Sequence, residues 1–488
     1  MRVLFAASEC APFVKTGGLA DVVSALPKAL AAEDISVTVV LPVYPSLKEI
    51  CDLGTRVATY DEPGFGRLEI VAAHAKGIDL LLVRAPHLYD RAGSIYLDAG
   101  GRDWPDNHLR FGALSKAAAR IAQEGAGGEP PDVLHAHDWQ AGLAPAYLRL
   151  AGDTRVKTVT TIHNIAFQGL FPAATLGVLG LPTSAFNARG YEYYDKVSFL
   201  KAGLVYADAI TTVSPTYARE LMSPEFGLGF EGIIAERRSR LSGILNGVEL
   251  SVWNPATDTA LTKRYDAESL RGRAANRVAL LKRFGLEIKP GAPLFCVVSR
   301  LTEQKGIDLL IEAIRALVAR GAGLAVLGTG DPRIEAALRA AERAHPQRVG
   351  TMIGYDERLS HEMMGGADVI VIPSRFEPCG LTQLYGLRYG CLPLVARTGG
   401  LADTVIDANE AAMVADVATG FQFAPVTGLA LADRIEAACD LFADRDAWQR
   451  MMLRAMASPV GWDRSAAAYA ALYRAPSTPS GQPAGELP

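Results

Sequence analysis

Two positive side chains stand close together where an apolar run ends. Arg300 and Lys305 lie in residues 299–306, which follow a strand expected at residues 294–299. Ligands of open parallel sheets bind at the carboxyl ends of the strands, so both cations are predicted to face a binding site. Each could stabilise a diphosphate leaving group by on the order of 4 kcal/mol before desolvation, at about 4 Å and an effective dielectric near 20. An ordinary polar loop is the alternative interpretation.

A carboxylate precedes the start of another predicted helix. Glu377 follows a strand expected at residues 369–373, and Gly380, Leu381 and Thr382 come next in the chain. The carboxylate can accept hydrogen bonds from sugar hydroxyls. The three N–H groups would lie at a helix N-terminus, where an anion is favoured. A helix entry with an acidic first turn would explain the same residues.

A glycine turn with an adjacent lysine follows the first predicted strand. Lys15 precedes Gly17 and Gly18, and a helix is expected at residues 19–32. Glycines let the backbone approach a ligand closely, and a helix start favours anions, so the turn suits a phosphate or a polar sugar. A tight strand-to-helix turn with a solvated lysine explains the residues equally well.

The same turn sequence occurs twice. Residues 16–21 and residues 398–403 both read Thr-Gly-Gly-Leu-Ala-Asp. Each copy follows a predicted strand and opens a predicted helix. One interpretation is that two similar sheets present glycine-lined helix starts to a shared cleft. The other is a common helix-start signal without a shared function.

Three histidines stand at the ends of predicted strands. His135 and His137 would share one face of the strand expected from residue 133, as two metal ligands would need. No third ligand is evident nearby, so a structural or substrate-binding role is favoured over a metal site. His163 ends the strand expected at residues 156–162 and could face a ligand.

Other nucleotide and metal motifs are incomplete. Gly328 and Gly330 begin a dinucleotide-binding fingerprint, but Arg333 stands where its third glycine belongs. No Walker A sequence occurs, and Gly365 replaces the second histidine of a zinc-protease pair that would begin at His361. A nicotinamide-dependent dehydrogenase is therefore disfavoured.

Composition sets broad limits on function. The 488 residues include 49 Lys and Arg against 53 Asp and Glu, a net charge of −4, which argues against binding nucleic acid through a general positive field. No apolar run reaches the roughly 18 residues that span a bilayer, and the apolar stretch at the N-terminus is too short for a signal peptide. The six cysteines form no Cys-x-x-Cys pair. We therefore expect a cytoplasmic protein that binds neither nucleic acid nor membrane.

Apolar periodicity predicts two α/β halves built from alternating strands and helices. In the first half, Pro27 is expected to kink or break its helix, and a long irregular insertion is expected between residues 84 and 109. The strands of the first half are expected at residues 3–8, 37–41, 133–136, 156–162 and 209–213, with helices at 19–32 and 141–150. Those of the second half are expected at residues 294–299, 324–327, 349–353, 369–373 and 392–396, with helices at 307–320, 334–344 and 381–389.

Six segments together resemble the bacterial glycogen synthases and plant starch synthases of glycosyltransferase family 5. They occur in the family's order from residue 1 to about residue 475, and their joint occurrence is specific although no single segment is. The segments are residues 15–22, 135–139, 161–164, 246–248, 300–306 and 377–383.

The resemblance implies a fold class and a domain division. The fold is α/β of the GT-B type, with two Rossmann-like domains whose parallel sheets face a deep cleft between them. The acceptor-side domain would span residues 1–242 and the nucleotide-sugar domain residues 246–457. A helix in residues 458–474 would cross back to the first domain. Residues 475–488 are rich in proline, serine and glycine and are expected to form a disordered tail.

The resemblance also implies site roles. Arg300 and Lys305 would hold the diphosphate, Glu377 would bind the donor glucose with nearby backbone amides, and His163 would contact the sugar near its anomeric centre. Tyr355 would stack on adenine. The implied donor-binding residues are Lys15, Gly17, Gly18, Asn246, Tyr355, Cys379, Gly380, Leu381 and Thr382. The implied acceptor-binding residues are Asp21, Tyr96, His137 and Trp139.

The implied reaction is retaining transfer of glucose from ADP-glucose to the non-reducing end of an α-1,4-glucan, glycogen or a malto-oligosaccharide, without a metal or other cofactor. Many retaining GT-B enzymes carry Glu-x7-Glu, but counting from Glu377 leads to Tyr385, so the second carboxylate is absent. A UDP-glucose-dependent or disaccharide-forming relative and a catalytically silent glucan-binding protein are the competing hypotheses. Oligomeric state is left open.

Overall fold

The computed structural model describes residues 1–98, 100–289 and 291–476, and the chain forms two compact units. The first unit contains Met1–Val213, Ala218–Leu245 and the chain from Trp462 onward. The second contains Ser214–Tyr217 and Asn246–Gly461. The predicted domain boundary at residues 242–246 thus coincides with the observed change of unit, whereas most of the predicted tail, residues 477–488, lies outside the described residues.

A nine-stranded sheet forms the core of the first unit within the described ranges, in the order β12-β11-β7-β6-β1-β2-β5-β4-β3. The strands from β12 to β5 are parallel, and β4 and β3 extend the sheet antiparallel. Its strands are β1 Arg2–Ala6, β2 Ser36–Pro42, β3 Thr55–Glu62, β4 Gly66–Ala75, β5 Ile78–Arg84, β6 Val133–His137, β7 Lys157–Ile162, β11 Ala209–Thr212 and β12 Leu241–Gly243. A second small sheet contains β8 Leu170–Pro172, β9 Glu192–Tyr193 and β10 Lys196–Ser198.

Helices connect the parallel strands of this unit. They are α1 Gly18–Leu30, α2 Lys48–Asp52, α3 Pro86–Tyr89, α4 Asn107–Glu124, α5 Leu143–Leu150, α6 Phe199–Tyr206, α8 Pro224–Gly227, α9 Glu231–Glu236 and α19 Asp463–Arg474, with α7 Pro215–Glu220 divided between the units. The C-terminal helix α19 is held in this unit because Lys157 Nζ donates to the backbone oxygens of Leu472 and Ala475, at 2.5 and 2.7 Å. Tyr473 also bonds His135 at 2.7 Å.

The structure tests two expectations for the first half. Of the kink or break expected at Pro27, the break does not occur, because the α1 helix continues through Pro27 to Leu30. The apolar face that includes Leu19, Val23 and Leu26 is buried on both sides of the proline, and this burial outweighs one lost backbone hydrogen bond. The expected irregular insertion contains the short α3 and ends where α4 begins at Asn107.

Six parallel strands form the sheet of the second unit in the order β15-β14-β13-β16-β17-β18 within the described ranges. This is the strand order 3-2-1-4-5-6 of dinucleotide-binding folds, which reverses between β13 and β16. The strands are β13 Leu294–Val298, β14 Gly323–Gly328, β15 Val349–Ile353, β16 Val369–Ile372, β17 Leu392–Ala396 and β18 Phe421–Phe423. The first unit reverses in the same way between β1 and β6.

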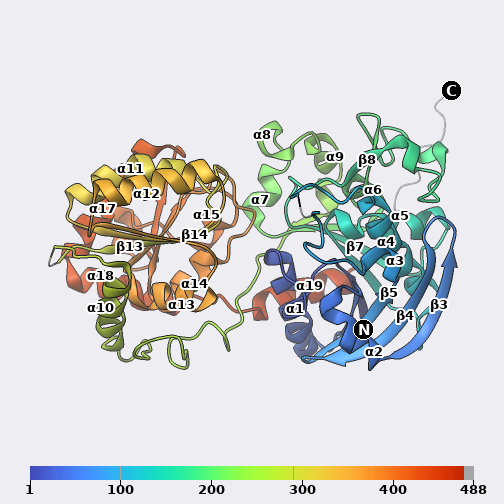
Figure 1. The fold of residues 1–488 in the computed structure, drawn as a ribbon, viewed down its shortest axis with the longest axis horizontal. Coiled ribbons are helices and arrows are strands. Elements are labelled where there is room, and N and C mark those ends of the chain that lie inside the picture. The colour runs from blue at the N-terminus through green and yellow to red at the C-terminus, as the bar shows by residue number, and fades with distance from the viewer. Residues whose placement is uncertain (99, 290, 477–488) are drawn as a thin grey trace. The chain divides into compact units, whose positions relative to one another are not determined.

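Helices cover both faces of this second sheet, with α11 and α12 on one side and α10 and α13 on the other (Figure 1). The helices are α10 Gly272–Phe284, α11 Ile307–Ala319, α12 Pro332–Ala344, α13 Glu357–Gly366, α14 Thr382–Tyr389, α15 Gly399–Thr404, α16 Glu410–Val414, α17 Gly428–Ala443 and α18 Arg445–Met456. The expected strands and helices of this half are confirmed to within about two residues. In the described ranges, none of the helices has the length and apolar character needed to cross a membrane.

Candidate functional site

A buried ion pair lies at the strand reversal of the second unit. Lys305 Nζ is 2.5 Å from Glu377 Oε2, and Ser374 Oγ donates to the same oxygen at 3.0 Å. The two charged side chains are only 17% and 10% exposed. Lys305 follows β13 and Glu377 follows β16, the two strands between which the order reverses. Residues 72 positions apart in the chain therefore meet where open α/β sheets bind ligands.

A glycine allows the two loops to meet. Gly306, just after Lys305, has φ +64°, and a Cβ there would lie 1.9 Å from the Pro373 backbone oxygen. Any other residue would force the loop after β13 away from the loop after β16. The local sequence thus positions the ammonium group beside the carboxylate.

A small pocket of about 60 Å³ opens beside this pair. Lys305, Glu377, Gly380, Leu381 and Thr382 all line it, as do the ends of β13 and β16. The residues after Gly380 lead into α14, whose N-terminal backbone amides favour a negative charge. The pocket therefore combines a cation, a hydrogen-bond acceptor and a helix start, which is a set suited to a sugar joined to a phosphate.

Gln383 is a site residue that the sequence reasoning missed. Its buried Nε2 donates to the backbone oxygens of Cys379 and Gly380, both at 3.0 Å. These bonds hold the turn that directs residues 380–382 toward the pocket. Gln383 itself lines the pocket, and its Oε1 has no hydrogen-bond partner within the described chain. Its position beside Thr382 was visible, but no sequence pattern distinguishes a glutamine that supports a turn.

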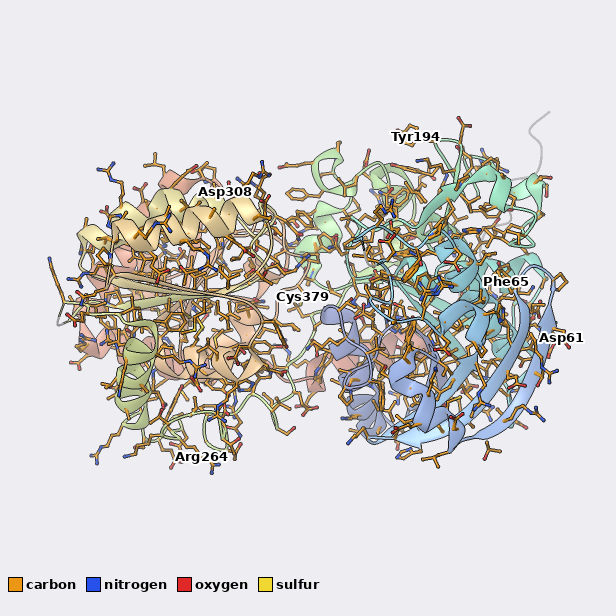
Figure 2. All side chains as sticks on the ribbon, in the orientation of Figure 1. Asp61, Phe65, Tyr194, Arg264, Asp308 and Cys379 are labelled. Carbon is orange, nitrogen blue, oxygen red and sulfur yellow. The ribbon has the colours of Figure 1, made fainter. Side chains whose placement is uncertain are left out.

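Four other predicted residues of this unit differ in exposure. Arg300 follows β13 and is exposed, and Tyr355 follows β15 with 79% of its surface exposed. Cys379, labelled in Figure 2, is buried. Burial raises the pKa of its thiol to about 12, although a hydrogen bond from the Asn246 backbone lowers it. The thiol is therefore protonated at neutral pH. Asn246 is buried, and its Oδ1 has no hydrogen-bond partner in the described ranges.

The position of the missing second carboxylate has a packing role. Tyr385 on α14 stacks on Trp253, with ring centroids 3.6 Å apart and planes 7° apart. Trp253 stacks on His361 on its other face, at 3.8 Å. These stacked rings join the segment after Asn246 to α13 and α14.

In the first unit, a buried carboxylate organises the Lys15–Gly18 turn. Glu9 accepts hydrogen bonds from the Thr16 N–H at 2.5 Å, the Thr16 hydroxyl at 2.6 Å and the Gly17 N–H at 3.2 Å. The Tyr96 hydroxyl donates to the same carboxylate at 2.6 Å. Glu9 follows β1, at the strand reversal of this unit. Sequence reasoning missed Glu9, although it is the first acidic residue after the first strand.

The surface of this turn is open. A Cβ built at Gly17 or Gly18 would meet nothing within 4 Å. Lys15 Nζ lies 2.7 Å from Asp21 Oδ1, and both side chains are partly exposed. One predicted donor-binding residue and one predicted acceptor-binding residue are therefore ion-paired across the open turn.

The histidines form a cluster at the ends of β6 and β7. His137 Nδ1 and His163 Nε2 are 3.0 Å apart, and the His135 and His137 rings stack at 4.1 Å. Burial lowers the pKa of His163 to about 3, so its imidazole is neutral. Asp138 Oδ1 accepts from the His163 N–H at 2.7 Å, and burial raises the pKa of Asp138 to about 7. The shared face predicted for His135 and His137 is confirmed.

Two of the predicted acceptor-binding residues are buried. His137 has no exposed surface, and Trp139 has only 9%. The Trp139 ring packs against Phe111 and Phe171 at centroid distances of 4.9 and 5.8 Å. Both rings pack in the core of the first unit, and their acceptor-binding role stays a prediction. In the described chain, no group of three or more His, Cys, Asp or Glu side chains is arranged to hold a metal ion.

The second Thr-Gly-Gly copy lies beside the Glu377 loop. The Gly400 N–H donates to the Glu377 oxygen at 3.1 Å, and a Cβ at Gly400 would lie 2.2 Å from the Cys379 oxygen. Gly399 has φ +43°, and a Cβ there would lie 1.9 Å from the Glu377 oxygen. Backbone atoms of the Glu377 loop pack directly against both glycines of this copy. These glycines therefore do not line an open surface, as one sequence interpretation expected.

Comparisons with known proteins agree along the chain. A family model described as starch synthase catalytic domain matches residues 2–236, and one described as glycosyl transferases group 1 matches residues 280–450. The glycogen synthase of Roseobacter denitrificans is 59% identical, covering 97% of this chain and 99% of that protein. The glycogen synthase of Rhodopseudomonas palustris is 52% identical over 97% of this chain and 98% of its own.

Solved structures show the same similarity. The catalytic domain of starch synthase IV from Arabidopsis thaliana, bound to ADP and acarbose, matches with a TM-score of 0.84 and 31% identity, covering 96% of this chain and 98% of that one. Sucrose-phosphate synthase from Thermosynechococcus elongatus matches with a TM-score of 0.57 and 18% identity over 97% and 98% of the two chains, which shows a shared fold alone.

Proposed function

We infer that this chain, which belongs to the starch and glycogen synthase family of glycosyltransferases and has the GT-B fold, transfers glucose from ADP-glucose to an α-1,4-glucan. The observation that carries this inference is the Lys305–Glu377 pair at the strand reversal of the second unit, 2.5 Å apart and next to the start of α14. A cation, a hydroxyl-binding carboxylate and a helix start are what a nucleotide-linked sugar requires.

The second unit would bind the donor. Lys305 and Arg300 would neutralise the diphosphate, with Arg300 reaching it from its exposed position after β13. Glu377 and the amides of residues 380–382 would bind the glucose. Tyr355, exposed after β15, would stack on adenine, while buried Asn246 and Cys379 would shape the site.

The first unit would contribute the remaining groups. The neutral imidazole of His163 would contact the sugar near its anomeric carbon without adding a positive charge. Lys15, Gly17 and Gly18 form the open turn, where a phosphate or sugar oxygen could approach the backbone. Asp21 and Tyr96 are the proposed acceptor-binding residues.

The chemistry would rest on protein cations. Negative charge grows on the diphosphate as its bond to glucose breaks, and an oxocarbenium-like sugar forms. Cations and helix-terminal amides already in place stabilise that charge more in the transition state than in the ground state. Same-face attack, with the departing phosphate accepting the proton of the acceptor hydroxyl, retains the configuration. We propose that no metal takes part.

The cellular setting is a further part of the proposal. All six cysteines are free and buried, which is consistent with a reducing compartment, so we place the enzyme in the cytoplasm. Its partners would be ADP-glucose and glycogen or a malto-oligosaccharide, without nucleic acid or membrane.

Incorporation of labelled glucose into glycogen tests the function. We expect incorporation from ADP-glucose, release of ADP and no loss of activity with EDTA. Lys305→Ala should lower kcat by about 10²- to 10³-fold, the range found when one preorganised donor is removed. Lys282→Ala, on the exposed surface of α10, is the control. Incorporation from UDP-glucose alone, or unchanged turnover in Lys305→Ala, would contradict the proposal.

A further inference from the structure

One arginine of the loop after β16 binds the loop after β13 in several places. The Arg375 N–H donates to the Gln304 backbone oxygen at 2.9 Å. Its Nη1 donates to the Glu303 backbone oxygen at 2.6 Å and to Asp308 Oδ1 at 2.7 Å. Its Nη2 donates to Asp308 Oδ2 at 2.6 Å. A single residue therefore holds the chain on both sides of Lys305.

The side chains of Arg375 and Asp308 are matched in geometry and charge, and we call them the Arg375–Asp308 clamp. Asp308, labelled in Figure 2, lies in the first turn of α11, where the helix dipole favours a negative charge. The hydrogen bonds from Arg375 lower the pKa of the Asp308 carboxyl, so this group is ionised at neutral pH. A planar guanidinium binds both carboxylate oxygens at once, which an ammonium group cannot do in the same geometry.

The other hydrogen-bonded link between these two loops is the Lys305–Glu377 pair itself. In the described ranges, every hydrogen bond between residues 299–308 and residues 373–383 involves either Arg375 or this pair. The close approach at Gly306 allows the loops to touch, but a steric contact does not hold them together. If the Lys305–Glu377 bond opens, Arg375 therefore supplies the hydrogen bonds that remain between the loops.

A bound donor would weaken the bond between Lys305 and Glu377. In the proposed function, the ammonium group turns to diphosphate oxygens and the carboxylate accepts a hydrogen bond from glucose. The two groups must then be kept at a fixed spacing by something other than their own contact. The clamp is suited to this, because neither Arg375 nor Asp308 lines the pocket beside the pair, and both can keep their bonds when the pocket is filled.

We propose that the Arg375–Asp308 clamp is a positioning device for glucose transfer. It keeps Lys305 and Glu377 at their working distance after the donor has taken up the hydrogen bonds of each. The inference rests on the proposed function for the roles of these two residues. A misplacement of reacting groups by about 1 Å can lower a rate about 10²-fold, so loss of the clamp should act on the chemical step. Binding of ADP should depend on it less, because ADP carries no glucose to draw Glu377 away from Lys305.

The test compares Arg375→Ala, Asp308→Ala and the double variant with wild type in the full chain. Arg375→Ala should lower kcat by about 10- to 100-fold, while the KM for ADP-glucose and the Kd for ADP change by less than about threefold. Asp308→Ala should lower kcat less, because Arg375 keeps its bond to the Glu303 oxygen. The double variant should be no worse than Arg375→Ala, since the two side chains act through one contact.

Stability and two further variants separate positioning from a structural role. The side chains of Arg375 and Asp308 are 41% and 35% exposed, so Tm should fall by less than about 3 °C in either variant. Arg375→Lys should recover part of kcat, because it restores the charge without the planar fork. Arg320→Ala is the matched control and should leave kcat unchanged. Arg320 caps the other end of α11, is 36% exposed and pairs with Asp440, away from both loops.

Several results would overturn the proposal. Losses of kcat that multiply in the double variant would mean that the two residues act separately. A higher KM for ADP-glucose with unchanged kcat would make Arg375 a direct ligand of the donor. A fall in Tm large enough to explain the lost activity would make the ion pair structural. Failure of the proposed function would show differently, as absent glucose transfer by the wild type, whereas unchanged kcat in Arg375→Ala beside an active wild type would exclude the clamp alone.

Discussion

The two Thr-Gly-Gly-Leu-Ala-Asp turns have the same sequence and opposite surroundings. In the first, a Cβ at Gly17 or Gly18 would meet nothing within 4 Å. Glu9, which is not part of the motif, holds this turn by accepting hydrogen bonds from its backbone. In the second, a Cβ at Gly400 would lie 2.2 Å from a backbone oxygen. The motif's own Asp403 bonds the Thr216 N–H and hydroxyl at 2.7 and 2.6 Å.

Topology explains the difference. The first copy follows β1, which stands at the strand reversal of its unit, where loops part and leave room for a ligand. The second follows β17, one strand beyond the reversal between β13 and β16, so the loop after β16 covers it. Glycine serves access in one turn and close packing in the other. Sequence identity therefore does not fix function; the strand that a motif follows does.

Acidification should destabilise the first unit more than the second, and this is the largest difference that we expect between them. Burial lowers the pKa of His135, His137 and His163. Below about pH 6.5 these histidines are therefore protonated in the unfolded chain but neutral in the folded first unit, and the folded state loses stability as the pH falls. Asp138 opposes them, because its raised pKa of about 7 makes the folded state bind a proton between about pH 7 and 4. Because three histidines destabilise the folded state and only Asp138 stabilises it, the free energy of unfolding should fall by about 2 to 3 kcal/mol per pH unit between about pH 6 and 5.

Hydrogen exchange read segment by segment measures this loss. After correction for the intrinsic effect of pH, β6 and β7 should lose protection at pH 5 well before β16 and β17. His74→Asn, which removes an exposed histidine of the same unit, should leave the profile unchanged. Equal loss of protection in both units would contradict the assignment of the pH response to the histidine cluster.

Gly400→Ala should damage the second turn severely. The new methyl group would overlap the Cys379 oxygen and displace the loop that carries Glu377. We expect a loss of about 3 kcal/mol in the free energy of unfolding and transfer activity reduced along with it. Urea denaturation followed by fluorescence measures the first, and ADP release the second. A variant with wild-type stability would show that the second turn is not closed.

Much of the architecture was predictable because apolar runs and turn residues are local signals. The strands of the second unit matched closely, and Lys305 and Glu377 were found because each follows such a strand. The antiparallel strands β3 and β4 were not anticipated, since an edge extension follows no alternating βα pattern. Whether the helix continues through Pro27 depended on how strongly that helix is buried, which the neighbouring sequence does not show.

The supporting residues of the site were harder to predict. Glu9 and Gln383 act through hydrogen bonds to turns, and their residue types are common wherever strands end and helices begin. The packing of Trp139 against Phe111 and Phe171 was not anticipated, because an aromatic residue near a histidine motif looks the same in sequence whether it is exposed or buried. The partner that decides each case, such as Tyr96 for Glu9, lies 87 residues away.

Gly17→Ala should have the opposite character to Gly400→Ala. Its methyl group meets no protein atom, and its φ of −157° is accessible to alanine, so the free energy of unfolding should change by less than about 0.5 kcal/mol. A ligand approaching the turn would meet the methyl group, and kcat/KM for ADP-glucose should fall about tenfold. Stability lost to the same extent as in Gly400→Ala would refute the contrast between the two turns.

Tyr96→Phe should have the smallest effect on catalysis and should decide between two roles for this residue. The hydroxyl donates to Glu9 at 2.6 Å, so its removal leaves one acceptor position of the carboxylate unfilled, at a cost of about 1 to 2 kcal/mol. If Tyr96 acts through Glu9 on the open turn, the KM for ADP-glucose should rise several-fold while the KM for maltotriose is unchanged. If it binds the acceptor directly, as the family resemblance implies, the pattern should reverse. Ser8→Ala, which removes the other hydrogen-bond partner of this hydroxyl at 2.7 Å, should reproduce the first pattern in weaker form.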